Sequence, residues 1–211
     1  MAKGGRVRLV VIRSGRTAWD EDGRFQGHAD LPLSPGGVED LGAMAKSLDV
    51  HFGSVFCATD ESSVESAKLI AKAAGGRVRQ TAGLAEPDLG LWEGKKAAGL
   101  AEQNPKTMRQ WREDPTAVCP PNGEAIAEAR LRIIDSAAKI LDRPLRKAVA
   151  IVVRPLAFGV LRSVIDELTP ETITAPHNDD NQANVLDRMV SSAMLRSRRE
   201  LPRRELAKVD G

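Results

Sequence analysis

The stretch that decides the fold is residues 7–17, which read V-R-L-V-V-I-R-S-G-R-T. An apolar run of this length, broken by one arginine, is typical of a β-strand covered on both faces, as in a parallel sheet. The run ends in Arg13-Ser14-Gly15, which places two polar side chains and a glycine where the strand stops. We therefore expect a buried strand over residues 7–12 with a polar site at its carboxyl end.

Strand-like and helix-like segments alternate along the rest of the chain. Ser34 is expected to cap a helix that has Pro35 in its first turn, because a serine oxygen accepts a free N–H there and proline has no N–H to satisfy. Alternation of strands and helices predicts a three-layer α/β/α sandwich with a mainly parallel sheet. Further strands are expected at 54–57, 77–79, 149–153 and near 185–186, and helices at 34–48, 60–71, 97–103, 105–113, 124–141 and 156–168.

The organisation of the chain is predicted from changes in its pattern. An irregular, proline-bounded stretch at about 88–122 is expected to form a small helical insertion in which Leu91, Trp92 and Trp111 pack. We expect one domain over residues 1–187, followed by a basic C-terminal tail over 188–211 that carries seven Lys or Arg against three acids. Proteins that bind single-stranded nucleic acid stack bases on aromatic side chains, and this tail has none. Nucleic acid is therefore not an expected partner, and a solvated terminus is the plainer interpretation.

Composition narrows the class of protein. Hydrophobic residues make up 42% of the chain and charged residues 28%, which is ordinary for a soluble globular protein. No segment approaches the ~20 apolar residues of a membrane span, and no apolar signal core precedes the first strand. We therefore expect a cytoplasmic protein with no membrane partner. Cys57 and Cys119 form no CxxC pair, and three scattered histidines have no metal-ligand spacing, so neither a metal nor a cofactor is expected.

Polar residues follow two of the predicted strands at their carboxyl ends. Arg13 and Ser14 follow the first strand, and Arg154 follows the strand at 149–153. In open α/β sheets, ligands bind outside the carboxyl ends of the strands. The sequence therefore predicts that these three side chains surround one cleft.

The residues beyond the first strand match the motif of a known family. The loop after Gly15 carries Thr17, Trp19, Arg24, Gln26, Gly27, Asp30, Pro32, Leu33 and Gly37. With the later segments 84–86, 90–94 and 121–124, this spacing resembles the histidine phosphatase (phosphoglycerate mutase-like) superfamily over roughly residues 7–186. The resemblance implies a phosphoglycerate mutase-like domain over 1–187 and makes a homodimer or another protein partner possible.

The resemblance also identifies the positions at which phosphoryl transfer takes place in the family. The family uses a nucleophilic histidine, a second histidine, two arginines and a glutamate that acts as an acid. In this sequence Ser14 stands at the position of the nucleophile, Ser62 at that of the second arginine, and Arg154 at that of the second histidine. Arg13 is retained, and Glu86 matches the acid.

These replacements predict the loss of catalysis. A serine hydroxyl needs a nearby base to act as a nucleophile, and Arg154, with a pKa above ~12, is not a base. The histidines do not fill the gap: His28 falls in a loop, His51 precedes a strand at the opposite end, and His177 lies in a polar loop. We therefore predict a catalytically inactive member of the family, a pseudoenzyme, with only vestigial residues at its catalytic positions.

The pocket left behind still holds cations. Arg13, Arg24 and Arg154 are predicted to bind phosphate or a phosphorylated small molecule, since guanidinium groups match the geometry of phosphate oxygens. Two alternatives stay open. One is a residual phosphatase or phosphomutase that acts on a phosphomonoester with Glu86. The other is a structural or assembly subunit whose pocket is filled by an Arg154–Glu86 pair and by Arg13 bound to another carboxylate.

Overall fold

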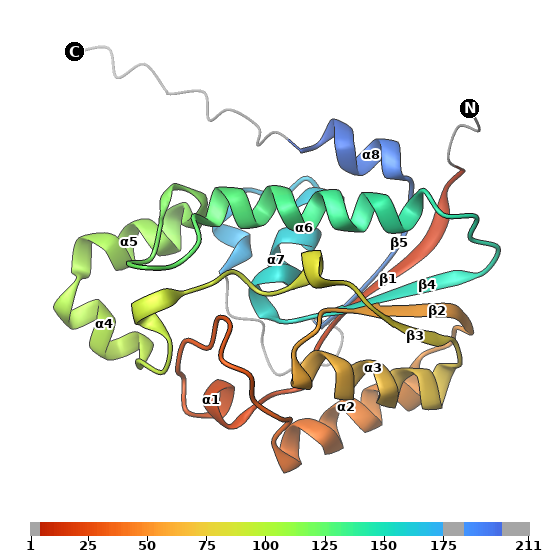
Figure 1. Cartoon of the computed structure of the whole chain (residues 1–211), viewed down its shortest axis with the longest axis horizontal. Coiled ribbons are helices and arrows are strands. Elements are labelled where there is room, and N and C mark those ends of the chain that lie inside the picture. Colours follow the sequence, from red (N-terminus) through yellow and green to blue (C-terminus); the bar gives the residue numbers. More distant parts are fainter. Residues whose placement is uncertain (1–4, 175–183, 200–211) are drawn as a thin grey trace.

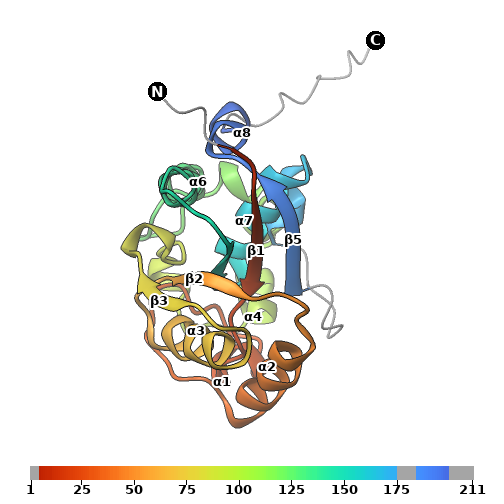
Figure 2. The same ribbon diagram turned by 90° about the vertical axis from the view of Figure 1, so that its right-hand side faces the viewer.

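A five-stranded sheet forms the centre of the molecule. The computed structural model describes residues 5–174 and 184–199, and its strand order is β3-β2-β4-β1-β5. The β1·β4, β2·β4 and β2·β3 pairs are parallel, whereas β5 runs antiparallel beside β1 at one edge, as Figure 2 shows. The sheet is therefore mainly parallel, as predicted. The strands are β1 (Val7–Arg13), β2 (Phe52–Cys57), β3 (Arg77–Gln80), β4 (Ala148–Val153) and β5 (Val185–Val190).

Both faces of the sheet are covered by helices. Leu9 and Val11 of β1 lie in one buried cluster with side chains of α6, α7 and α8, whereas Val10 and Ile12 lie in a second with side chains of α2 and α3. Figure 1 shows these two groups of helices on opposite sides of the sheet, which confirms the three-layer sandwich. The helices are α2 (Pro35–Ser47), α3 (Glu61–Ala74), α6 (Ile126–Leu141), α7 (Pro155–Ile165) and α8 (Ser192–Ser197).

Helices α2 and α3 begin with the local signals that the sequence offers. The Ser34 side chain accepts a hydrogen bond from the Gly37 N–H, and Pro35 is the first residue of α2, so the predicted cap is confirmed. The Asp60 carboxylate caps α3 in the same way, by accepting from the Ser63 N–H at 2.9 Å.

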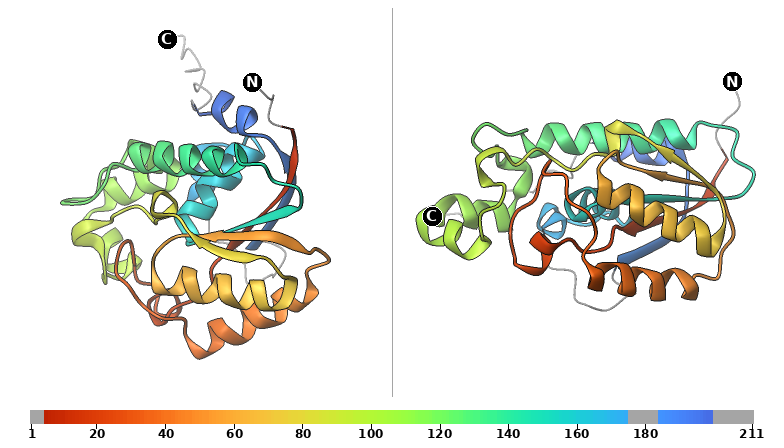
Figure 3. Two further views of the ribbon diagram at one scale, coloured as in Figure 1. Left: turned by 45° about the vertical axis from the view of Figure 1, so that its right-hand side comes forward. Right: turned by 60° about the horizontal axis from the view of Figure 1, so that its bottom comes forward.

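The insertion forms a small cluster of its own. Residues 88–122 contain η2 (Gly90–Trp92), α4 (Ala97–Gln103), α5 (Pro105–Glu113) and η3 (Pro115–Ala117), and Figure 3 shows α4 and α5 at one end of the molecule, beyond the sheet. The rings of Trp92 and Trp111 lie edge to face, 5.3 Å apart, and both pack against Phe25. Leu91, expected to pack with them, is 55% exposed, because neighbouring residues of the η2 turn point in different directions.

The C-terminal boundary that the sequence suggested needs correction. Residue 187 lies inside β5, which pairs with β1 along its whole length. Leu195 of α8 is fully buried, and the Arg130 guanidinium of α6 donates hydrogen bonds to the carbonyl groups of Arg198 and Arg199. Residues 188–199 therefore belong to the domain by their packing, although their charge resembles that of a tail. Residues 200–211 lie outside the described part of the chain.

Three short elements complete the fold: α1 (Ala18–Glu21), η1 (Ala82–Leu84) and η4 (Pro170–Ile173). Within the described ranges, no helix has the length and apolar character needed to cross a bilayer.

Candidate functional site

The structure brings together the residues that follow β1 and β4. Arg13 is paired in register with Val153, and the Ser14 N–H donates to the Val153 carbonyl at 2.8 Å. Arg154 is the next residue after β4, so Ser14 and Arg154 continue two adjacent parallel strands. This arrangement follows directly from the topology, because parallel strands present their carboxyl ends at one edge of a sheet.

Arg154 is a buried cation with a carboxylate partner that the sequence did not suggest. Its side chain is 2% exposed, and Nη2 lies 3.4 Å from the Asp20 carboxylate, while Nη1 donates to the Ser62 hydroxyl at 3.2 Å. The pairing expected for a filled pocket, Arg154 with Glu86, is therefore corrected to Arg154 with Asp20. The Arg154 Nε is buried and has no hydrogen-bond partner in the described structure.

Asp20 is the site residue that sequence reasoning missed. It occupies the first turn of α1, where its carboxylate accepts from the Thr17 N–H at 2.8 Å while the Thr17 hydroxyl accepts from the Asp20 N–H. This reciprocal arrangement is a capping box, and its T-x-x-D pattern was visible in the sequence. The pattern predicts only a helix start, since nothing local indicates that the other carboxylate oxygen faces Arg154.

Arg13 is a second cation in the same place, with weaker compensation. Within the described structure, the Arg13 side chain makes one hydrogen bond, a long one of 3.5 Å from Nη1 to the Asn184 side-chain oxygen. Burial lowers the pKa of the Arg13 guanidinium, and nearby Arg154 lowers it further, whereas the Asp20 and Glu86 carboxylates oppose that shift. Because guanidinium groups remain protonated in proteins, Arg13 contributes a positive charge, and no carboxylate of the described residues is hydrogen-bonded to it.

Glu86 belongs to the loop that follows η1, and its carboxylate lies against the first turn of α7. Its two carboxylate oxygens accept from the Leu156 and Ala157 N–H groups at 2.8 and 2.9 Å. Burial raises the pKa of the Glu86 carboxyl to about 6, and Asp60 adds to the rise, while Arg154 and the two N–H groups offset part of it. Glu86 is therefore a carboxyl group that changes charge close to neutral pH.

Two other side chains hold the backbone of Glu86 in place. The Arg132 guanidinium of α6 donates to the carbonyl groups of Ala85 and Glu86 and forms a two-bond ion pair with Glu124. The His28 Nε2 lies 2.9 Å from the Glu86 carbonyl. Because a carbonyl only accepts, Nε2 carries the proton in this contact, and it is not free to act as a nucleophile.

The two serines of the site differ in their contacts. The Ser62 hydroxyl donates to Asp60 at 2.8 Å and accepts from Arg154. The Ser14 Oγ is buried and has no hydrogen-bond partner in the described structure. A nucleophilic serine needs a base within hydrogen-bond reach, and Ser14 has none there.

Arg24 does not take part in this cluster by any contact in the structure. Its guanidinium donates to the Asp22 carboxylate at 2.5 Å and to the Gly94 carbonyl at 2.7 Å, and its backbone bridges to Lys96. These contacts fasten the loop to the insertion. The expected convergence of three arginines is therefore corrected to the pair Arg13 and Arg154.

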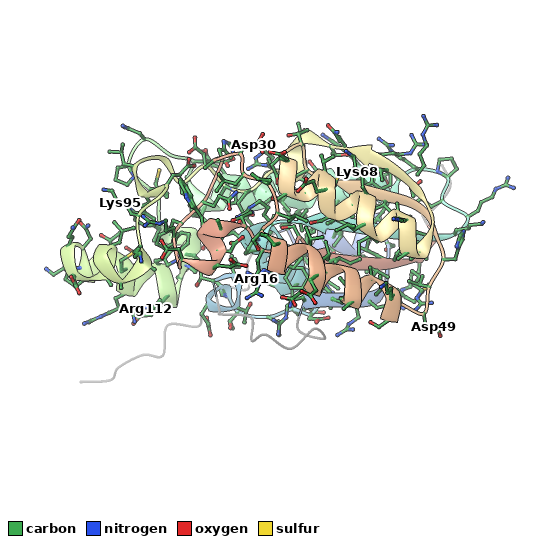
Figure 4. All side chains as sticks on the ribbon, turned by 90° about the horizontal axis from the view of Figure 1, so that it is seen from below. Arg16, Asp30, Asp49, Lys68, Lys95 and Arg112 are labelled. Carbon is green, nitrogen blue, oxygen red and sulfur yellow. The ribbon has the colours of Figure 1, made fainter. Side chains whose placement is uncertain are left out.

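A cavity of about 250 Å³ opens beside Glu86, lined by Gly27, His28, Asp30, Thr59, Asp60, Ala85 and Glu86. Figure 4 shows Asp30 and Arg16 near the middle of the molecule's length, between Lys95 and Arg112 toward one end and Asp49, which follows α2, toward the other. The described lining contains carboxylates and a histidine but no lysine or arginine. No group of metal-ligating side chains is present within the described ranges.

The two remaining histidines are not part of the described site. The His51 ring packs against Gly75, where an added Cβ would lie 2.2 Å from a ring carbon, and precedes β2 at the end opposite the site. His177 lies outside the described residues. His28 is an exposed loop histidine, as expected, and it also lines the cavity because its loop folds against Glu86.

A family model and several known proteins match this chain. The model of the histidine phosphatase superfamily (branch 1) matches residues 9–198. A bifunctional protein of Mycobacterium tuberculosis is 31% identical over 134 residues, which cover 63% of this chain and 36% of that protein. The match thus spans about a third of the length of that relative. Phosphoserine phosphatase 1 of Hydrogenobacter thermophilus is 26% identical over 147 residues, 69% of this chain and 70% of its own length.

Solved structures share the fold. YhfR of Bacillus stearothermophilus superposes with a TM-score of 0.72 and 25% identity, over 80% of this chain and 84% of that one. A phosphoglycerate mutase from Bacillus anthracis superposes with a TM-score of 0.68 and 20% identity, over 94% of this chain and 99% of that one. The second likeness concerns the fold alone.

Proposed function

This chain belongs to the histidine phosphatase superfamily, and we propose that it is a member that binds a phosphorylated small molecule without transferring its phosphoryl group. The observation that carries the proposal is the Arg13–Arg154 pair: two clustered guanidinium groups to which the described residues supply one carboxylate in direct contact, that of Asp20. The buried Ser14 Oγ and Arg154 Nε beside them have no partner in the described structure. Buried polar groups are almost always paired, so these two atoms support a bound ligand or water.

The lack of turnover follows from the same residues. Phosphoryl transfer through the enzyme needs a nucleophile and a base to activate it. Among the described residues no base contacts Ser14, Arg154 is permanently protonated, and His28 Nε2 is engaged with the Glu86 carbonyl. We therefore expect phosphate recognition to persist where the chemistry has been lost.

A residual phosphatase is the second candidate, and one observation favours it. Glu86 lines the cavity, and its pKa of about 6 suits a group that donates a proton to a leaving oxygen near neutral pH. Relatives named as phosphatases and mutases are consistent with it. This candidate requires a nucleophile such as a water molecule, which His28 would have to activate through Nδ1.

The test combines binding and turnover. We expect calorimetric titration with inorganic phosphate to show saturable binding that Arg13→Gln weakens by about tenfold, since a charge-assisted contact contributes ~1.5 kcal/mol or more. Arg24→Gln is the matched control and should leave the affinity unchanged, because its guanidinium is held by Asp22 and Gly94. Hydrolysis of an aryl phosphate should stay at background. A clear rate that Glu86→Gln abolishes would support the residual phosphatase instead.

A further inference from the structure

The start of α7 is capped from a distance. Arg154 precedes the helix with extended backbone and makes no side-chain cap, and Pro155 at the first position has no N–H. The next two N–H groups, of Leu156 and Ala157, donate to Glu86, a residue about 70 positions earlier in the chain. Helix N-termini present such N–H groups to anions, and here a side chain of the protein itself supplies the anion.

The Glu86 carboxylate uses the donors that an oxyanion in this site would use. Its two oxygens are held by two N–H groups, and Arg154 and Arg13 act on it electrostatically. A phosphate or sulfate group presents the same arrangement of charged oxygens to amides and guanidinium groups. The Arg154 Nε and the Ser14 Oγ are buried and have no hydrogen-bond partner in the described structure. Arg154 directly precedes α7, and the Ser14 N–H donates to the carbonyl of Val153, the last residue of β4, so both residues lie at this strand end with unused hydrogen-bonding capacity.

We propose that Glu86 is a built-in competitor of the bound anion: it occupies the N-terminus of α7 in the unliganded protein, and an anion binds by displacing it. The inference rests on the proposed function, because it concerns the regulation of the same Arg13–Arg154 site. An anion that enters takes over the Leu156 and Ala157 N–H groups, while the released carboxyl turns toward the cavity that it already lines.

Protonation of the Glu86 carboxyl regulates this competition. The charged groups around Glu86 and its cavity are Arg13, Arg154 and Arg132 on the positive side and Asp30 and Asp60 on the negative side. Asp20 lies against Arg154, and the His28 ring contacts the Glu86 carbonyl. A neutral carboxyl holds the two N–H groups and the guanidinium groups less strongly than a carboxylate. With the Glu86 pKa at about 6, anion affinity should rise by up to about 20-fold from about pH 7.5 to about pH 5.5.

The experiment uses sulfate as the probe, because its charge stays constant over this range while that of phosphate does not. Calorimetric titrations of the whole chain are made at both pH values with the parent protein, Glu86→Gln and Glu93→Gln. Glu93 is the matched control, since its carboxylate also accepts from two backbone N–H groups, those of His28 and Leu89. We expect Glu86→Gln to bind sulfate about tenfold more tightly at neutral pH and to lose the pH dependence, whereas Glu93→Gln keeps it.

The outcomes separate the inference from the function on which it rests. Sulfate binding by the parent that Glu86→Gln leaves unchanged overturns the competitor and keeps the anion site. Binding by Glu86→Gln alone supports the competitor and shows that the parent site is closed, which overturns the proposed function. Binding by neither overturns both. If Glu86→Gln does not fold, the Leu156 and Ala157 amide signals in ¹⁵N spectra of the parent provide the test. Saturable shifts of these signals with sulfate support the displacement of Glu86. Signals that stay unchanged while sulfate binds saturably contradict it.

Discussion

Helices α3 and α7 follow two neighbouring parallel strands, β2 and β4, yet their first turns are capped in opposite ways. Asp60 caps α3 locally, whereas α7 has no local cap and receives Glu86 from a distant loop. The hydrogen bond from Arg154 to Ser62 joins the two helix starts. A local cap stabilises its own helix, whereas a distant cap fixes a loop, a helix and a site together.

The largest expected effect comes from replacing Ser14, together with Ser62 and Arg154 at the two helix starts, by the residues that the family has at these positions. If the site keeps family geometry, the triple change Ser14→His, Ser62→Arg and Arg154→His should restore single-turnover phosphorylation of residue 14. We expect labelling at least ~10²-fold above the parent, since single electrostatic donors are worth ~10²–10³ in rate. Ser14→His alone should not be labelled, because Arg154 still fills the space against Ser62.

Mass spectrometry after incubation with a phosphodonor detects the acid-labile phosphate. Full labelling of Ser14→His alone would show that Ser62 and Arg154 do not prevent phosphorylation of residue 14. A folded triple variant without label would show that the site has drifted from family geometry.

Removing each cap in turn measures how much the distant cap and the local cap contribute to the free energy of unfolding. Glu86→Ala leaves two N–H groups buried without an acceptor, and we expect a loss of about 3 kcal/mol in the free energy of unfolding. Asp60→Ala removes a local cap and should cost about 1 kcal/mol. Urea denaturation at neutral pH measures both. Equal losses would show that the distant cap contributes no more to stability than the local one.

The local caps of α2 and α3 could be predicted from the sequence, whereas the distant cap of α7 could not. Ser34 and Asp60 stand next to the helices they cap, so their roles are visible in a few residues. The β1 run predicts a strand covered on both faces because each successive side chain meets a different helix layer. The cap on α7 involves a residue about 70 positions away, and its partner is known only once β4 lies beside β1.

The errors in the predicted site have the same origin. Arg24 was expected near Arg13 because both belong to one motif, but it is tied to Gly94 of the insertion. Asp20 carries no local sign of its role, because only the fold turns its carboxylate toward Arg154. The boundary at residue 187 followed the charge of the C-terminal segment, which says nothing of the pairing of β5 with β1.

The pH dependence of stability provides a smaller effect. The pKa of Glu86 in the folded protein, about 6, lies above its ordinary value of 4.5, so the folded state binds more protons than the unfolded state between these values. The contribution of Glu86 is therefore fully present below about pH 4.5 and is lost as pH rises through about 6, by about 2 kcal/mol. Denaturation of the parent and of Glu86→Gln across this range should show a difference that falls with rising pH. A stability difference that does not change with pH would show that folding does not raise the pKa of the Glu86 carboxyl.

The smallest effect sharpens the link between the two caps. Asp60 raises the pKa of Glu86 by its negative charge, and Asp60→Asn removes that charge while an asparagine still caps α3. We expect the titration midpoint of the Glu86 carboxyl, followed by ¹³C spectra, to move to lower pH with little change in stability. An unchanged midpoint would show that the two helix starts are electrostatically independent.

The central claim, recognition of a phosphoryl group without its transfer, is tested most directly by ³¹P spectra of a phosphomonoester mixed with the protein. One spectrum series reports both events, since binding shifts or broadens the ester signal and hydrolysis produces inorganic phosphate. The account predicts a saturable change in the ester signal that Arg13→Gln removes, with no inorganic phosphate above the protein-free control. Inorganic phosphate that accumulates with the parent and not with Glu86→Gln, or an ester signal that the protein leaves unchanged, would contradict it.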